Sequence, residues 1–258
     1  MIKQFKNGAV PALAIALAAA LALTLTACST KTDSNAEAGA TTQSATLAPQ
    51  LDALRARHRA EAPAAILQIA EHQKDLLREA GIVTRALNVG DAAPSFALPN
   101  SEGDTITLAS LLENGPVVLT FYRGAWCPYC NLQLQALQEY LPQFKSVNAQ
   151  LVAVSPELPD KAVMVAKKNK LEFEVLSDVG SSLARQFGIV YELCSELDSL
   201  MANNGMDLRD RNMCSKAELP LAATYIIGAD GVIRWAYLTE DYTYRAEPAE
   251  ILEAMQTM

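Results

Sequence analysis

Residues 116–137, PVVLTFYRGAWCPYCNLQLQAL, contain the features that decide the fold. The apolar run PVVLTFY is rich in β-branched and aromatic side chains, which is typical of a strand that is buried on both faces. After CPYC, leucines recur at helical spacing. Cys127 and Cys130 therefore come just after a buried strand, in the first turn of a helix. Open α/β sheets carry their active sites at this position.

The segments on both sides continue this alternation of strands and helices. QLVAVS, FEVLS, ATYIIG and VIRWAYL are typical of strands, whereas DKAVMVAKKN, SSLARQFG and EPAEILEAM have helical spacing. FALPNSEGDTITL, which precedes them, indicates a short hairpin around a glycine turn. The pattern predicts an α/β fold with a central mixed sheet flanked by helices, ending in an antiparallel hairpin.

An N-terminal helical extension is predicted over residues 49–90, where apolar residues recur at three- and four-residue spacing as far as Gly81. We expect this extension to serve packing or dimerisation, which leaves a homodimer open. His58 and His72 lie here among charged residues. Because the chain has only these two histidines, we expect both to be solvated on the helix surface rather than catalytic or metal-binding.

The first 48 residues predict export and membrane attachment. Two lysines followed by AVPALAIALAAALALTLT are typical of a secretory signal. LTAC at residues 25–28 resembles a bacterial lipobox, which implies cleavage before Cys28 and acylation of that cysteine. Ser29 then favours the outer membrane, with the domain facing the periplasm. A retained N-terminal anchor and an ordinary signal peptide cut elsewhere are the alternatives.

These patterns divide the chain into four parts: a signal peptide at 1–27, a polar tether at 28–48, the helical extension at 49–90 and an α/β domain at 91–258. Removing the signal peptide, with its two lysines and no acidic residue, changes the net charge from -8 to -10. An acidic body argues against nucleic acid as a partner.

The spacing of Cys127 and Cys130 suits reversible disulfide chemistry, because residues three apart on a helix have Cβ atoms roughly 5–6 Å apart. Pro128 suits the first helical turn. Lowering a thiol pKa from about 8.5 to about 6 requires about 3.4 kcal/mol, and a helix N-terminus supplies only about 0.3–2 kcal/mol. We expect Arg123, four residues before Cys127, to supply the remainder. A surface salt bridge is the alternative role of Arg123.

Five stretches together resemble the peroxiredoxin-like (AhpC/TSA, redoxin-domain) branch of the thioredoxin-fold thiol peroxidases. They are GDAAPSFALPNSEGDTITLASLL, GPVVLTFYRGAWCPYCNLQLQAL, LVAVSPELPD, LEFEVLSD and ATYIIGADGVIRWAYLTEDYTYRAEP. The resemblance covers about residues 50–257 and implies a thioredoxin-like fold that reduces hydrogen peroxide or organic hydroperoxides without a cofactor or metal.

By this resemblance Cys127 matches the peroxidatic cysteine, whose thiolate attacks the peroxide and becomes a sulfenic acid. Cys130 would then condense with it to form a disulfide, which a dithiol donor of the thioredoxin type must reduce. The chain also departs from the family. The typical proline and threonine, seven and three residues before the peroxidatic cysteine, are here Thr120 and Gly124. Arg123 and Thr120 are the substitutes that we expect to polarise the peroxide.

Two further departures concern the end of the domain. The later arginine of typical peroxiredoxins would align near Ala222, and the cis-proline of thioredoxins is matched by Ala223. CPYC is also the glutaredoxin tetrapeptide, so the alternative function is an envelope thiol–disulfide oxidoreductase that acts on protein disulfides. A tethered, non-enzymatic domain with an inert disulfide is a third interpretation. A zinc site lacks a second CxxC or a nearby histidine.

The remaining cysteines, Cys194 and Cys214, bracket the polar segment ELDSLMANNGMDLRDRNM. In an oxidising envelope such a pair predicts a structural disulfide. Closing a loop of this length would stabilise the fold by roughly 3 kcal/mol. The alternatives are that one of them resolves Cys127, or that both are free thiols.

Three aromatic residues and one arginine are the remaining candidate residues of the sequence. Trp126 is expected to shape the pocket beside Cys127 or a docking surface. For Tyr242, Tyr244 and Arg245, in the stretch DYTYRAEP, we expect packing and helix capping.

Overall fold

The computed structural model describes residues 46–258. The predicted signal peptide, the predicted acylation site Cys28 and nearly all of the predicted tether lie outside these residues. Among the helices that the structure describes, none is long and apolar enough to span a bilayer.

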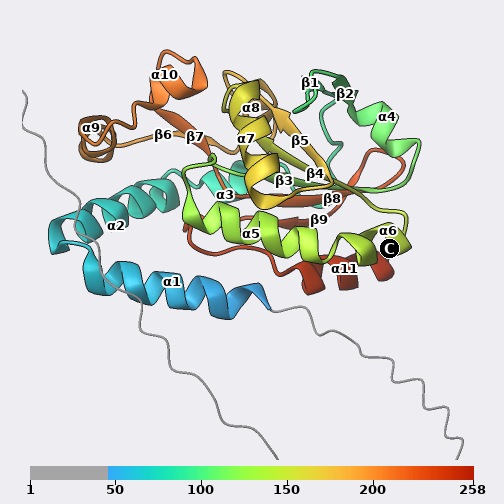
Figure 1. The fold of residues 1–258 in the computed structure, drawn as a ribbon, viewed down its shortest axis with the longest axis horizontal. Coiled ribbons are helices and arrows are strands. Elements are labelled where there is room, and N and C mark those ends of the chain that lie inside the picture. The colour runs from blue at the N-terminus through green and yellow to red at the C-terminus, as the bar shows by residue number, and fades with distance from the viewer. Residues whose placement is uncertain (1–45) are drawn as a thin grey trace, which may run out of the picture. The chain divides into compact units, whose positions relative to one another are not determined.

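A five-stranded sheet with the order β5-β4-β3-β8-β9 forms the centre of the fold (Figure 1). Strands β3, β4 and β5 are parallel, whereas β8 is antiparallel to both β3 and β9. The predicted mixed sheet with a terminal antiparallel hairpin is therefore confirmed. The strands span Val117–Phe121 (β3), Gln150–Ser155 (β4), Glu174–Ser177 (β5), Thr224–Ile227 (β8) and Ile233–Tyr237 (β9).

Helices cover both faces of the sheet, and the alternation of side chains along β3 shows how. Leu119 and Phe121 belong to one apolar cluster, together with residues of α3, α4 and α8. Val118 points the other way and packs with α5, α6 and α11. The helices span Ile82–Arg85 (α3), Leu108–Leu112 (α4), Ser182–Gln186 (α8), Pro128–Glu139 (α5), Leu141–Ser146 (α6), Pro159–Asn169 (α7) and Pro248–Gln256 (α11).

Two small antiparallel pairs flank the central sheet. The first, β1 (Ala97–Pro99) with β2 (Thr105–Thr107), is the hairpin predicted from FALPNSEGDTITL. The second, β6 (Val190–Glu192) with β7 (Glu218–Pro220), closes the base of an insertion. That insertion carries α9 (Ser195–Asn203) and α10 (Leu208–Asn212) and contains both Cys194 and Cys214.

The N-terminal extension is a helical hairpin of α1 (Leu47–Glu61) and α2 (Ala64–Glu79), broken at Pro63. Its first helix runs beside α5 (Figure 1). Leu47, Leu51 and Leu54 of α1 are buried in the same apolar cluster as Cys127 and Cys130. The predicted packing role is therefore confirmed, and the extension covers the helix that carries the two cysteines.

Candidate redox site

The loop between β3 and α5 places Cys127 at the N-cap of α5 and Pro128 at its first helical position, as the sequence predicts. The Cys127 backbone N–H donates to the carbonyl of Gly124 over 3.1 Å. Gly124 has φ +149°, and a Cβ there would lie 2.8 Å from Cδ of Glu157. Only glycine fits this close approach, so its presence at the typical threonine position has a local structural reason.

Glu157, just after β4, holds this loop in place. Its carboxylate is fully buried and accepts a hydrogen bond from the Ala125 backbone N–H over 2.5 Å. Arg211, at the end of the insertion, donates to the same carboxylate over 3.0 Å. The Cys194–Cys214 insertion therefore contacts the segment that precedes Cys127.

Two buried arginines lie beside the thiols, which are themselves buried at 1 % exposure for Cys127 and 0 % for Cys130. Arg245 donates from Nη2 to Sγ of Cys130 over 3.4 Å. Arg123 is 4 % exposed and stacks its guanidinium on Tyr242, 4.1 Å from the ring centroid, and on Trp126, 4.9 Å away. The structure thus brings the predicted Arg123 into the site and adds Arg245.

The charge of the thiol pair differs from the expectation that Cys127 holds the thiolate. Burial and the hydrogen bond with Cys130 raise the pKa of Cys127, although Arg123 and Arg245 oppose this. Burial also raises the pKa of Cys130, but the hydrogen bond with Cys127 and the charges of the two arginines outweigh it and lower this pKa well below its ordinary value. The two thiols hydrogen-bond to each other and titrate as a pair, and the contact with Arg245 favours the anion on Cys130 rather than on Cys127, where the sequence led us to expect it.

Several buried N–H groups of the site have no hydrogen-bond partner within residues 46–258. They are Nε of Arg123, Nε of Arg245 and Nε1 of Trp126. An unpaired donor costs free energy unless a ligand or water satisfies it. Because they belong to residues that contact or adjoin the thiols, these donors are suited to bind the oxygens of a substrate.

Thr120 is the one proposed substitute that the structure does not place among these donors. Its side chain is fully buried between β3, β8 and α5. Its hydroxyl lies 3.0 Å from that of Thr224 and accepts from Nε2 of Gln133 over 3.3 Å. Ala222 and Ala223 are both buried just before β8, where the Ala223 carbonyl accepts from the Phe121 N–H over 2.7 Å. Thr120 and Ala223 therefore join the end of β3 to its neighbour.

His58 also differs from the expectation of a solvated residue. It is half-buried, with Nδ1 3.1 Å from the Tyr129 hydroxyl, and its ring meets the edge of the Tyr129 ring. Tyr129 in turn packs edge-on against Tyr242, with centroids 5.7 Å apart. The correction has a tertiary cause, because α1 lies against α5. His72 is exposed, as expected.

Within residues 46–258, the four cysteines Cys127, Cys130, Cys194 and Cys214 form no disulfide in this structure. Pairing of β6 with β7 brings Glu192 opposite Glu218, which sets both cysteines near the base of the insertion. The Cys194 N–H donates to Oε1 of Gln73 in α2 over 2.6 Å. The disulfide between Cys194 and Cys214 stays a prediction. Within the described part of the chain, no group of His, Cys, Asp and Glu side chains could hold a metal ion.

Together, the sheet and the buried dithiol at the start of α5 define a thioredoxin-fold thiol oxidoreductase. Comparison with known proteins makes the class specific. The profile of the AhpC/TSA family matches residues 89–236. The chain therefore belongs to the AhpC/TSA family, as the sequence resemblance predicts.

Individual relatives agree with this family. The chain is 26 % identical over 180 residues to chloroplastic peroxiredoxin Q of Triticum aestivum, which covers 70 % of this chain and 72 % of the relative. It is 31 % identical over 103 residues to peroxiredoxin Bcp of Escherichia coli K12, covering 40 % of this chain and 65 % of the relative.

Solved structures show the same fold. Peroxidoxin BcpB of Mycobacterium tuberculosis superposes with a TM-score of 0.54 at 24 % identity, over 67 % of this chain and 98 % of that one. As a member of the peroxiredoxin family, the chain is an oxidoreductase of the thiol-peroxidase class.

Proposed function

We propose that this protein reduces hydrogen peroxide or organic hydroperoxides with Cys130 as the attacking thiolate and Cys127 as the resolving thiol. This order reverses the one expected from the sequence. The hydrogen bond from Arg245 to Sγ of Cys130 carries the assignment. The lowered pKa of Cys130 supports it, because the thiolate, not the thiol, is the nucleophile.

In the first step the Cys130 sulfur attacks one peroxide oxygen, and the O–O bond breaks. The departing oxygen takes a proton and leaves as water or an alcohol, while Cys130 becomes a sulfenic acid. The arginine charges would stabilise the negative charge that develops on the leaving oxygen. Arg123 and Trp126 offer unpaired N–H donors for this purpose.

In the second step the Cys127 thiol attacks the sulfenic sulfur of Cys130, and water is released as the disulfide forms. The two electrons that reduced the peroxide thus come from the dithiol. A dithiol donor of the thioredoxin type would return the pair to its reduced state. Because Cys127 and Cys130 lie on one helical turn, the disulfide closes without a large rearrangement of the fold.

The test separates the two orders of attack. The reduced chain, a Cys127→Ser variant and a Cys130→Ser variant are mixed with hydrogen peroxide in stopped flow, with Trp126 fluorescence as the readout. Sulfenic acid is then trapped with dimedone and located by mass spectrometry. We expect Cys130→Ser to lose fast oxidation and Cys127→Ser to accumulate sulfenic acid on Cys130. The opposite pattern would restore Cys127 as the attacking residue.

Oxidation of the unmodified chain at the rate of a free thiol, with either peroxide class, would contradict the peroxidase proposal. Exchange with protein disulfides would then be the better candidate.

We also propose that the protein works in the bacterial cell envelope, attached to the membrane through acylated Cys28 and facing the periplasm. The support is the LTAC sequence at residues 25–28. Labelling with a palmitate analogue should modify the chain and be lost in Cys28→Ala. Equal labelling of both proteins would contradict the anchor.

A further inference from the structure

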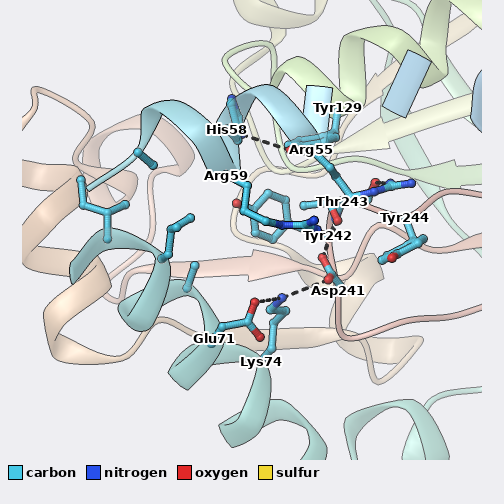
Figure 2. A pocket seen from close by; sticks show the side chains of 14 residues that line it. Arg55, His58, Arg59, Glu71, Lys74, Tyr129, Asp241, Tyr242, Thr243 and Tyr244 are labelled. Carbon is cyan, nitrogen blue, oxygen red and sulfur yellow. Dashed lines mark hydrogen bonds and ion pairs between the residues drawn. The ribbon is translucent and has the colours of Figure 1, made fainter. Parts of the chain in front are cut away.

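A pocket of about 340 Å³ lies between the α1–α2 hairpin and the segment 241–244 (Figure 2). Nearly all of its walls come from outside the residues that match the family profile, 89–236. Tyr129, on α5, is the lining residue from within the matched part. The pocket is thus built mainly by the segments that flank the family domain.

The charged residues that line the pocket are three cations, Arg55, Arg59 and Lys74, and two carboxylates, Glu71 and Asp241. Lys74 is already paired with Glu71 and Asp241, at 2.5 and 3.0 Å. Arg55 also lines the pocket and is held by Asp52 and by the carbonyl of Thr243.

Arg59 lines the same pocket and makes no ion pair or side-chain hydrogen bond with any residue of the described chain. It therefore leaves one positive charge free for a ligand, in a chain whose net charge is -8.

The remaining wall is apolar and aromatic. Ile66, Leu67 and Ala70 of α2 line the pocket, together with Tyr129 and Tyr244. Ile66 is 36 % exposed, a large apolar side chain that water reaches. A pocket of this size with aromatic walls and a few polar groups is typical of a small-molecule site. The combination fits an amphipathic ligand with an acidic head and a hydrocarbon chain.

Two of the residues that line the pocket, Tyr129 and Tyr242, also contact the surroundings of the thiols. Tyr129 precedes Cys130 directly in the sequence and lines the pocket. Tyr242 lines the pocket as well, and its ring carries the guanidinium of Arg123 at 4.1 Å. These two tyrosines pack edge-on against each other; Tyr129 belongs to the apolar cluster that contains both thiols, and Tyr242 packs against that cluster.

We propose that this pocket binds long-chain carboxylates, with the carboxylate at Arg59 and the hydrocarbon chain along α2. For catalysis it would hold a fatty-acid hydroperoxide, and the peroxide group would reach Cys130 when Tyr242 moves aside. The inference deepens the proposed peroxidase function and rests on it for the chemical step. Binding itself does not depend on that step.

The first experiment measures binding of dodecanoate, which cannot be reduced, to the full reduced chain by titration calorimetry. Ala70→Phe fills the pocket and should weaken binding at least about tenfold, whereas Ala65→Phe, on an exposed position of α2 outside the pocket, should leave it unchanged. Arg59→Gln removes the charge-assisted contact and should weaken binding about tenfold. Arg57→Gln, exposed on α1 and outside the pocket, is its matched control.

Equal binding to Ala70→Phe and Ala65→Phe, each shown to be folded by circular dichroism, would overturn the site. So would the absence of dodecanoate binding to the unmodified chain, or equal binding to Arg59→Gln and Arg57→Gln.

The second experiment compares two substrates in the same variants. Ala70→Phe should lower kcat/KM for linoleic acid hydroperoxide at least about tenfold and leave the rate with hydrogen peroxide unchanged, because the smaller peroxide needs no chain-binding pocket. Equal effects on both substrates, or on neither, would overturn the substrate assignment. If the unmodified chain reduces neither peroxide, the proposed function fails, while the dodecanoate titration still decides the pocket.

Discussion

The part of the chain that matches the AhpC/TSA profile, residues 89–236, and the segments that flank it contribute differently to the site. The matched part holds the sheet, the loop with Arg123 and both cysteines of the pair. The flanking segments, 46–88 and 237–258, hold Arg245, which hydrogen-bonds to Cys130, and α1, which covers α5. The family domain thus positions the thiols and supplies Arg123, while its surroundings add Arg245 beside Cys130 and build most of the adjacent pocket.

The flanking segments also contact each other. The Leu47 N–H donates to Oε2 of Glu247, the N-cap of α11, over 3.1 Å. Arg55 donates to the Thr243 carbonyl over 2.7 Å and lies over the Tyr244 ring, 4.1 Å from its centroid. The N-terminal helices and the C-terminal segment therefore form one layer against the redox helix, and the comparison makes measurable predictions about that layer.

The largest effect is expected for Leu51→Ala. Leu51 is 2 % exposed and packs in the cluster that contains both thiols. Removing a buried leucine side chain should lower the free energy of unfolding by about 2–4 kcal/mol. Urea denaturation measures the change, with the half-exposed Leu76→Ala of α2 as the control, expected within about 1 kcal/mol. A similar small change in both variants would mean that α1 is only appended to the family domain.

Arg245→Met tests whether a flanking residue sets the charge of the thiol pair. Arg245 lowers the pKa of Cys130, so the variant should have a higher thiol pKa. Thiolate exists above the pKa, so a shift of about one to two pKa units should lower the rate of oxidation by about 10- to 100-fold at pH values below the old pKa, and by less between the old and the new pKa. The two proteins should converge at higher pH.

The pH profile of iodoacetamide alkylation measures this shift. Arg234→Met, at an exposed arginine paired with Asp230, is the control for the loss of one positive charge. An unchanged profile in Arg245→Met would show that the matched part alone determines the reactivity of the thiols.

Glu157→Gln tests whether a charge inside the matched part holds the loop that precedes Cys127. The variant keeps the shape but loses the charge that binds Arg211 and the Ala125 N–H. Because hydrogen bonds to a buried charge are strong, unfolding should become easier by about 1–3 kcal/mol. Glu192→Gln, which removes one side of the exposed pair with Lys216, should cost under about 1 kcal/mol. Equal losses in thermal denaturation would argue against a role of Glu157 in holding the loop.

The smallest effect concerns Asp241, which joins the C-terminal segment to α2. Burial raises its pKa, but the hydrogen bonds from Thr243 and Lys74 outweigh burial and lower it below the ordinary value. A carboxyl group with a lowered pKa adds stability above the pKa of the unfolded chain, and this stability is lost as pH falls through the folded value.

Asp241→Asn should therefore cost under about 1 kcal/mol near pH 7, since solvent screens the pair. The difference should shrink as the pH falls below about 4 and vanish only below the folded-state pKa of Asp241. Urea titrations at several pH values measure it. A constant difference down to the lowest pH would contradict the assignment to this ion pair.

The amino-acid sequence by itself determined the order of strands and helices, the place of Cys127 and Cys130 at the start of α5, and the family. These features follow from local periodicity, helix-start signals and a resemblance carried by contiguous stretches, all of which can be read along the chain. The hairpin at β1 and β2 and the antiparallel end of the sheet belong to the same category.

Only the tertiary structure decided what surrounds the two sulfurs. Arg245 is 115 residues from Cys130 in the chain, and His58 is 71 residues from Tyr129. No local pattern encodes such contacts, because they arise when the N-terminal helices and the C-terminal segment pack on α5. The charge of a buried thiol depends on the groups that burial places around it, and the fold brings these together from three separate parts of the chain.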